Sequence, residues 1–325
     1  MRLTANELAR EAAATGFQTE PLEKVILLLE LLEAIRSHPF LKERVVLKGG
    51  TALNVFRFDV PRLSVDIDLN YIGTVDRDGM LADRPKIEQA LHAVCGRVGV
   101  QPRRVPSDHA GGKWRLNFNR VAGGTSTLEM DVNFLLRTPL WPVERIDSRP
   151  VGTFQATDVP VLDIHELAAG KLAALLSRTA SRDLFDASQL LRGGGLDAPK
   201  LRLAFVVYGG TSRKDWRTVS GENVTVDAEE ANAMLIPLLR GRDTPHRSDQ
   251  AQWTKTLVAD CHELLAMVLP LTDPEREFLE RLNGKGEILP EVLTDDERLR
   301  EIIRTHPGLL WKALNVQQYR DRPNV

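Results

Sequence analysis

The spacing of hydrophobic and polar residues divides the chain into a first part that mixes helices with strands and a second part that is almost entirely helical. Apolar residues at helical spacing predict helices over residues 4–14, 21–37 and 84–97. Short buried or alternating runs predict strands over residues 44–50, 63–72, 113–120 and 126–136. We therefore expect the first part of the chain to form a mixed sheet with flanking helices.

A proline-rich connection that ends near residue 160 marks the change from one part to the other. Asp163 and Glu166 after it have the spacing of a capping box, which predicts the start of a helix. The pattern beyond is mainly helical, and we place the domain boundary near residue 155. The expected fold class is α/β (α+β), with the sheet in residues 1–155 and a mainly helical domain in residues 156–325.

Composition and charge narrow the classes of function. The 325 residues are 42% hydrophobic and 27% charged, which is typical of a globular protein rather than a disordered one. A formal net charge of -2 provides no overall attraction to nucleic acid or to a membrane, so any polyanion site must be a local patch. Two isolated cysteines, and no apolar stretch of about 20 residues, predict a cytoplasmic protein with no membrane partner.

Two pairs of acidic residues lie on predicted strands. In "RLSVDIDL", Asp66 and Asp68 share one strand face because side chains alternate along a strand. In "LEMDVNF", Glu129 and Asp131 share a face in the same way, and either would supply a third carboxylate. Neighbouring carboxylates repel unless a cation lies between them, and Mg²⁺ prefers carboxylate oxygens. The pattern predicts a Mg²⁺ site, with Mn²⁺ as an alternative, although a lone pair of strand aspartates is usually a solvated edge.

A glycine turn precedes the first acidic pair. Gly49 and Gly50 in "LKGGTAL" allow the backbone to approach a ligand, and Thr51 begins a predicted helix whose first N–H groups would face an anion. Alone, such a sequence is more often a plain turn. Ahead of two aspartates it predicts a cradle for a nucleoside triphosphate (NTP) bound with Mg²⁺. Ser64, one strand step before Asp66, would hydrogen-bond a phosphate or cap a turn.

Several motifs together resemble one protein family. The runs "LKGGTAL", "RLSVDIDLNYI", "LEMDVNFLLRTPL" and "ELAAGKLAALLSRTASRDLFDASQLL" are similar to the AbiEii/AbiGii family of nucleotidyltransferase toxins, which includes the MenA-type toxins. The resemblance implies a DNA polymerase β-like nucleotidyltransferase fold and a place in a toxin-antitoxin or phage-defence system with a cognate antitoxin. It also implies transfer of a nucleotide to the 3′ acceptor end of tRNA, which blocks aminoacylation.

The resemblance assigns roles to the residues that match the family motifs. Those matched to phosphate binding are Gly49, Gly50, Thr51 and Lys171. Those matched to metal binding are Asp66 and Asp68, with Asp131 chosen as the third carboxylate and Glu129 as the alternative. The acid of the last motif is Asp186, with Asp183 as the alternative.

Further charges follow Lys171 in "GKLAALLSRTASRDLFD". In an unbroken helix four residues would lie on one stripe: Lys171, Arg178, Arg182 and Asp186. The three cations of that stripe would then bind phosphates. This prediction depends on the helix continuing past Thr179, and its alternative is a solvated face on which Arg182 pairs with Asp186.

A basic patch with one aromatic residue surrounds the third predicted strand. Against the single acid Asp108, its six cationic residues are Arg97, Arg103, Arg104, Lys113, Arg115 and Arg120. The patch would contact RNA phosphates while Trp114 stacks on an unpaired base of tRNA. The alternative is an edge hairpin with Trp114 in the core. Trp311, near the end of the chain, is predicted to be a core residue.

Other functions are compatible with the same residues. A small molecule or a protein hydroxyl would replace tRNA as acceptor if the site included a deep pocket with acids for an amine. A degenerate domain would bind nucleotide without catalysis, although the intact acids and Lys171 argue against it. A metal-dependent RNA hydrolase would use the acids but has no need for the glycine turn.

Overall fold

The computed structural model describes residues 3–105, 111–178 and 180–320, and the chain forms two compact units. The sheet unit comprises Met1–Arg137, Pro142–Leu162 and Asn232–His246. The helical unit comprises Thr138–Trp141, Asp163–Ala231 and Arg247–Val325. The chain therefore passes between the two units more than once.

This division differs from the predicted boundary near residue 155. The sheet unit extends to Leu162 because the chain there still bonds to the sheet through its backbone N–H, 3.1 Å from the carbonyl oxygen of Leu47. Two segments are also exchanged, since Thr138–Trp141 belongs to the helical unit and Asn232–His246 to the sheet unit. Thr138–Trp141 is too short to carry a hydrophobic period, and Asn232–His246 joins the sheet unit through contacts with residues remote in sequence, so a single boundary between residues 1–155 and 156–325 missed both.

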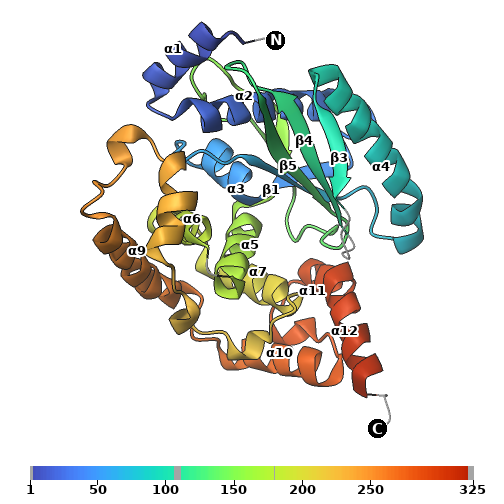
Figure 1. Ribbon diagram of the computed structural model, residues 1–325. Helices are drawn as coiled ribbons and strands as arrows, with labels where there is room; N and C mark the ends of the chain where they lie inside the picture. Colours follow the sequence, from blue (N-terminus) through green and yellow to red (C-terminus); the bar gives the residue numbers. More distant parts are fainter. Residues whose placement is uncertain (1–2, 106–110, 179, 321–325) are drawn as a thin grey trace. The chain divides into compact units, whose positions relative to one another are not determined.

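Within the described residues, a seven-stranded sheet forms the centre of the sheet unit (Figure 1). Its strands are β1 (Val45–Lys48), β2 (Asp66–Tyr71), β3 (Gln101–Val105), β4 (Gly112–Asn119), β5 (Thr125–Asn133), β6 (Glu144–Ile146) and β7 (Val159–Val161). Their order is β3-β4-β5-β2-β1-β7-β6. The pairs β2/β5 and β1/β7 are parallel and the others antiparallel, so the sheet is mixed, as predicted.

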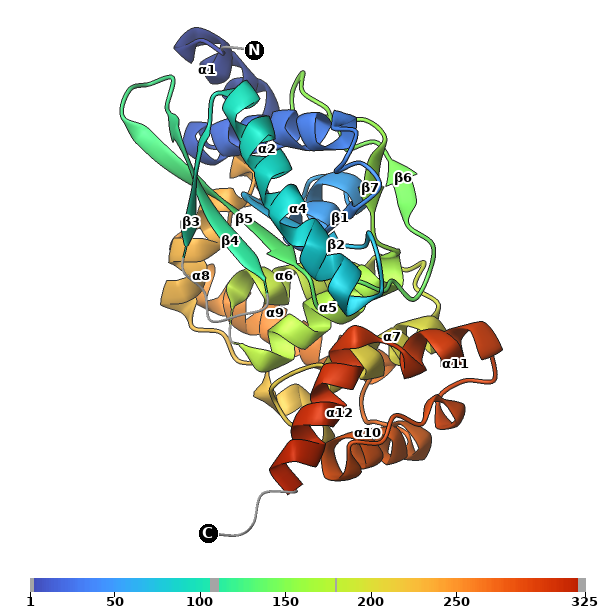
Figure 2. The same cartoon turned by 90° about the vertical axis from the view of Figure 1, so that its right-hand side faces the viewer.

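Helices cover one face of this sheet. Those of the sheet unit are α1 (Ala5–Thr15), α2 (Thr19–Ser37), α3 (Gly49–Thr51) and α4 (Arg77–Val98), and α3 continues as a π-helical turn, η1 (Ala52–Arg57). The two long helices α2 and α4 lie along the same face (Figure 2). Along β2, Ile67 and Leu69 are buried, whereas Asp66 and Asp68 on the opposite face are partly exposed. The apolar side of the sheet packs under the helices, which leaves its polar side for chemistry.

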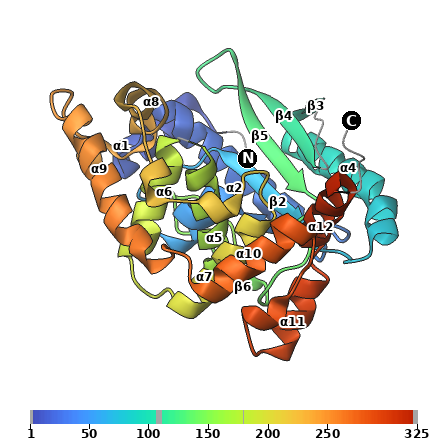
Figure 3. The ribbon, with the colours of Figure 1, turned by 90° about the horizontal axis from the view of Figure 1, so that it is seen from below.

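The helical unit is built around α5 and α7 (Figure 3). Its helices are α5 (Ile164–Ser177), α6 (Ser181–Arg192), α7 (Ala198–Gly210), α8 (Ala228–Met234, which ends in the sheet unit), α9 (Gln250–Leu264), α10 (Asp273–Lys285), α11 (Glu297–Arg304) and α12 (Pro307–Arg320). Short 3₁₀ turns lie at Trp216–Thr218, Gly221–Asn223, Ile236–Leu238, Gly241–Asp243, Leu265–Met267 and Pro290–Val292. The fully buried rings of Phe205 and Trp216 lie 5.3 Å apart in its core.

The predicted elements are present, and the differences have local causes. Helix α4 begins earlier than predicted because the side chain of Asp76 caps it, accepting from the N–H of Gly79 at 2.7 Å. Strand β3 was not predicted because it is an exposed edge strand that contains Pro102. Trp311 is 42% exposed on α12, so its predicted place in the core is wrong. No helix among the described residues is long and apolar enough to cross a membrane.

Candidate active site

A glycine turn joins β1 to the helix that follows it. Gly49 has φ +75°, a left-handed backbone conformation that favours glycine. A Cβ atom at this position would lie 2.3 Å from Oδ2 of Asp68, so there is no room for a side chain. The carboxylate of Asp68 therefore lies directly against the backbone of the turn.

Polar side chains anchor the helix after the turn. The helix begins at Gly49 rather than at Thr51 as predicted. Thr51 is fully buried, and its Oγ1 donates a hydrogen bond to the carbonyl oxygen of Asp66 at 2.6 Å. Nδ2 of Asn54 donates to the carbonyl oxygen of Gly50 at 3.0 Å. The Thr51 side chain thus fastens the turn to β2, and an anion would meet the backbone N–H groups rather than this hydroxyl.

The acids of β2 and β5 lie side by side on a parallel pair of strands. Asp66 is the direct partner of Glu129, and Asp68 is the direct partner of Asp131. All four are partly exposed, on the face opposite to the buried residues of both strands. Because neighbouring strands lie about 4.8 Å apart, each pair brings two carboxylates within reach of one cation. The adjacency on which a third carboxylate depends is therefore present.

Glu129 and Asp131 differ in their neighbours on β4. The carboxylate of Glu129 lies 2.6 Å from Nζ of Lys113 and 3.8 Å from Nε of Arg115. Asp131 is the strand partner of Lys113 on one side and of Asp68 on the other. Two cations of β4 therefore engage Glu129, and the strand register places Asp131, not Glu129, directly beside Asp68.

Ser64 ends a loop that is held by the Asn232–His246 segment. The N–H of Leu63 donates to the carbonyl oxygen of Leu238 at 2.9 Å, and Arg62 forms an antiparallel bridge with the residue after Leu238. Ser64 itself is buried, at 5% exposure. The start of β2 is therefore positioned by a segment that is remote in sequence.

A buried cluster of charges surrounds Lys171 in the helical unit. Its Nζ lies 2.8 Å from Oδ1 of Asp183 and 2.9 Å from Oδ2 of Asp186. Nε of Arg178 donates to Oδ2 of Asp183 at 2.7 Å. Burial would raise the pKa of Asp183, but Lys171 and Arg178 outweigh it, so the pKa is lowered. Asp183 and Asp186, between which the sequence motif could not decide, therefore both bind Lys171.

The stripe of charges predicted for an unbroken helix is not formed. Helices α5 and α6 are separate, so residue offsets counted from Lys171 do not describe one helix face. Arg178 ends α5 in extended backbone, and Arg182 lies half-buried on α6, while Thr179 is outside the described residues. The break allows α6 to turn back and bring its two aspartates to Lys171.

A family model spans both groups of residues. The family described as "Nucleotidyl transferase AbiEii toxin, Type IV TA system" matches residues 30–281. The chain belongs to this family. The protein is therefore a nucleotidyltransferase toxin of a type IV toxin-antitoxin system, as the motifs implied, with an NTP as its substrate and an antitoxin in the same system.

A solved structure shows the same fold. MenT4, a nucleotidyltransferase toxin from Mycobacterium tuberculosis H37Rv, matches with a TM-score of 0.61 at 20% sequence identity. The match covers 95% of this chain and 99% of the MenT4 chain. The predicted mixed α/β nucleotidyltransferase fold is confirmed. No curated protein matches the sequence.

The carboxylates of the sheet unit fit a divalent cation by their chemistry. Mg²⁺ and Mn²⁺ both take carboxylate oxygens, and Asp68 has Asp131 beside it and Asp66 on the same strand face. In the part of the chain that the structure describes, however, no three His, Cys, Asp or Glu side chains are gathered as a metal site. The predicted ligands are neighbours on the sheet without forming a closed set.

The structure divides the predicted basic patch. Trp114 is 3% exposed, and a Cβ at Gly112 would lie 2.2 Å from Cη2 of its ring, so Trp114 is a core residue and does not stack on a base. On the opposite face of β4, the side chains of Lys113 and Arg115 are 40% and 61% exposed. Asp108 lies outside the described residues. The exposed cations therefore lie on the same face as the acids of β5.

Glu166 has a function that its sequence spacing did not predict. It forms no capping box with Asp163. Its carboxylate accepts hydrogen bonds from the backbone N–H groups of Leu140 at 3.0 Å and Trp141 at 3.2 Å, and from the hydroxyl of Tyr208 at 3.0 Å. Burial raises its pKa to about 7. Glu166 thereby fixes the exchanged segment within the helical unit, and partners so remote in sequence leave no local signal.

Proposed function

We propose that the protein transfers a nucleoside monophosphate from an NTP to the 3′-hydroxyl at the acceptor end of tRNA, with release of pyrophosphate. Nucleotidyl transfer itself follows from the family, and tRNA as the acceptor is the proposed part. A tRNA extended in this way has lost its normal 3′ end, so its aminoacylation would be blocked. Because tRNA and NTPs are cytoplasmic, the protein would act there.

The observation that carries the proposal is the order of charges across the open face of the sheet. Strands β2 and β5 present Asp68 and Asp131, and the next strand, β4, presents Lys113 and Arg115. On the edge strand β3, Arg103 is the partner of Arg115. An acidic centre bordered by exposed cations suits a polyanion whose end reaches the acids while its phosphates lie over the cations.

The proposed reaction replaces a phosphoanhydride bond of the NTP with a phosphodiester bond to the RNA. The 3′ oxygen of the RNA bonds to the α-phosphorus, the bond from that phosphorus to the bridging oxygen of pyrophosphate breaks, and the hydroxyl proton passes to a base. Asp131 would accept the proton, acting together with the metal, because it is the direct strand partner of Asp68. Asp66 and Asp68 would hold Mg²⁺, which neutralises phosphate charge when bound.

The triphosphate would be held by backbone and by cations. Gly49 leaves the backbone accessible for phosphates, and Ser64 would add a hydroxyl from the loop before β2. Lys171 would provide a point charge for the triphosphate, with its ammonium held in place by the two aspartates of α6.

The first test incubates the purified protein with Mg²⁺, each α-labelled NTP in turn, and total tRNA. We expect label on the tRNA 3′ end, none on tRNA oxidised with periodate, and none with Asp68→Asn. Label on protein or on small molecules instead would change the acceptor. No label on any acceptor would leave an inactive nucleotide-binding domain.

A matched pair of substitutions on β5 tests the choice of base. Asp131→Asn should lower kcat by about 10²–10⁴-fold, the usual contribution of a general base. Glu129→Gln lies on the same strand face and removes a charge already neutralised by β4, so kcat should change by less than about tenfold. The reverse order of effects would assign the role to Glu129.

A further inference from the structure

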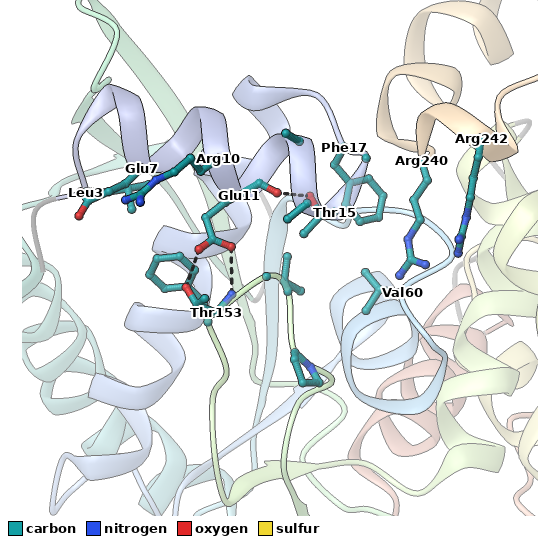
Figure 4. A pocket seen from close by; sticks show the side chains of 17 residues that line it. Leu3, Glu7, Arg10, Glu11, Thr15, Phe17, Val60, Thr153, Arg240 and Arg242 are labelled. Carbon is teal, nitrogen blue, oxygen red and sulfur yellow. Dashed lines mark hydrogen bonds between the residues drawn. The ribbon is translucent and has the colours of Figure 1, made fainter.

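A large open groove in the sheet unit is lined by residues other than those of the candidate active site. Its volume is about 1080 Å³. Helix α1, the loop at residues 150–154, Val60 and the segment at residues 240–242 surround it (Figure 4). Among the described residues that line it, none belongs to the candidate active site.

The carboxylates among the described lining residues are bound within the protein. Oε1 of Glu11 accepts from Oγ1 of Thr153 at 2.7 Å, and its Oε2 accepts from the backbone N–H of Thr153 at 3.0 Å (Figure 4). Glu7 completes the capping box of α1 and accepts from the N–H of Thr4 at 2.8 Å. Both acids therefore hold the rim in place and do not make the groove a cation site.

Arginines supply the positive charge of the groove. Arg240 lies over the ring of Phe17, 5.3 Å from its centroid, and its Nη2 donates to the carbonyl oxygen of Asp59 at 3.1 Å. Its buried Nε has no hydrogen-bond partner among the described residues. Arg242 is 75% exposed, with an exposed acid 3.8 Å away, and Arg10 is exposed on α1. Guanidinium groups in this setting suit phosphate, which they bind through two parallel hydrogen bonds.

The lining between the arginines is apolar. Phe17, Val60, Val151 and Phe154 contribute to it. Val60 has φ +48°, an uncommon backbone conformation for a β-branched residue, and such strain concentrates at functional sites. Cations beside an apolar surface match the two halves of a nucleotide, a charged phosphate and a flat base.

We propose that this groove is a second nucleotide-binding site, separate from the NTP site, in which Arg10 and Arg242 bind phosphate and the apolar lining contacts the base. The same chemistry is offered by one unit of an RNA strand and by a free nucleotide. The volume of about 1080 Å³ is at the upper end of small-molecule pockets, which span roughly 300–1,000 Å³, and the acceptor proposed above is an RNA, so the RNA strand is the favoured occupant. The choice of an RNA strand as the occupant rests on the proposed function, whereas the proposal that the groove binds a nucleotide does not.

The groove shares a segment with the loop before β2. The N–H of Gly241 donates to the carbonyl oxygen of Gly16 at 2.8 Å, at the end of α1. Three residues earlier, the carbonyl oxygen of Leu238 accepts from the N–H of Leu63 at 2.9 Å. An occupied groove would therefore steady the loop that leads into Asp66.

The test measures binding of a labelled 12-nucleotide single-stranded RNA, without NTP, over a range of salt concentrations. The variant is Arg10→Gln with Arg242→Gln, and the control is Arg77→Gln with Arg276→Gln, two exposed arginines outside the groove. Each phosphate contact on a single strand contributes about 0.7 to the slope of log K against log salt. The groove variant should therefore lower the slope by about 1.4, and the control should lower it less.

A second measurement identifies a free nucleotide as the occupant. Equilibrium dialysis with ATP should then give two bound nucleotides per parent chain and one per groove variant. Replacing the same residues as Arg10→Lys and Arg242→Lys keeps the charge and should restore most of the lost binding in either case. An unchanged salt slope together with an unchanged nucleotide stoichiometry overturns the proposal.

Nucleotidyl transfer at saturating RNA keeps the two proposals distinguishable. If the groove variant binds RNA as the parent does and tRNA is still labelled, the groove proposal fails and the proposed function stands. If the groove variant loses RNA binding as expected but the parent labels no tRNA, the groove proposal is upheld and the proposed acceptor fails.

Discussion

Replacing Gly49 with alanine separates two reasons for a glycine at the turn after β1. The first is the backbone, since φ +75° costs a residue with a Cβ atom about 1–2 kcal/mol. The second is the 2.3 Å between that Cβ and Oδ2 of Asp68. Nonbonded heavy atoms meet at about 3.5 Å, so the carboxylate would have to move by about 1 Å.

Gly99 provides the matched control. Its φ is +82°, close to that of Gly49, and no atom lies within 4 Å of the place where its Cβ would be. Gly99→Ala should therefore lower the free energy of unfolding by the backbone cost alone, about 1–2 kcal/mol. Gly49→Ala should add the cost of overpacking against Asp68, about 1–3 kcal/mol.

Two assays read the outcome. Urea denaturation compares the free energies of unfolding, and nucleotidyl transfer compares kcat/KM. A misplacement of about 1 Å in a reacting constellation costs on the order of 10²-fold in rate, so Gly49→Ala should lose about that much activity while Gly99→Ala keeps nearly all of it. Equal losses of stability and activity in the two variants would refute the reasoning that the turn holds Asp68.

Three further changes test other parts of the structure. Burial raises the pKa of Glu166 from 4.5 to about 7, so the parent should lose about 3 kcal/mol of unfolding free energy as the pH rises from 4.5 through 7. Glu166→Gln should flatten that dependence in urea titrations, and a flat profile in the parent would contradict the assignment. Trp114→Ala should cost about 3–5 kcal/mol of unfolding free energy without changing the salt dependence of RNA binding. A changed salt slope would indicate that Trp114 is part of an RNA-binding surface. Asp183→Asn removes one of the carboxylates of Lys171 and should cost about 3 kcal/mol in calorimetry at pH 7. Because the pKa of Asp183 is lowered, its contribution is present above pH 3.8 and is lost as the pH falls through the lowered value, so a cost unchanged in strong acid would argue against the ion cluster.

The alternation of side chains along a strand was enough to predict which acidic residues share a face of the sheet. Because the side-chain period of a strand is two, Asp66 and Asp68 had to share a face, and so did Glu129 and Asp131. The glycine turn was equally visible, since Gly49 and Gly50 stand between a predicted strand and a predicted helix. What alternation did not provide is the register, which makes Asp131 rather than Glu129 the partner of Asp68.

The features that escaped prediction depend on contacts between remote residues. The cluster at Lys171 formed because the chain leaves α5 and returns in α6, and a periodicity that assumes one helix hides that turn. Trp114 alternates with cations along its strand, and this pattern is consistent both with a ring exposed on an RNA-binding surface and with a ring buried in the core. Only the packing of the ring against Gly112 decides between the two. Arg240 and Arg242 had no motif, because their groove is assembled from four separate stretches of the chain.

The exchanged segment Asn232–His246 has a consequence for synthesis of the toxin. The sheet unit uses this segment to bond Leu63 and Gly16, so a nascent chain that ends at Leu162 contains all seven strands of the described sheet and still lacks part of its support. At roughly 5–20 residues per second, the ribosome needs several more seconds to reach His246. The loop before Asp66 is therefore completed late, and a nucleotidyltransferase that arose from a broken message or an early stop would be released without it.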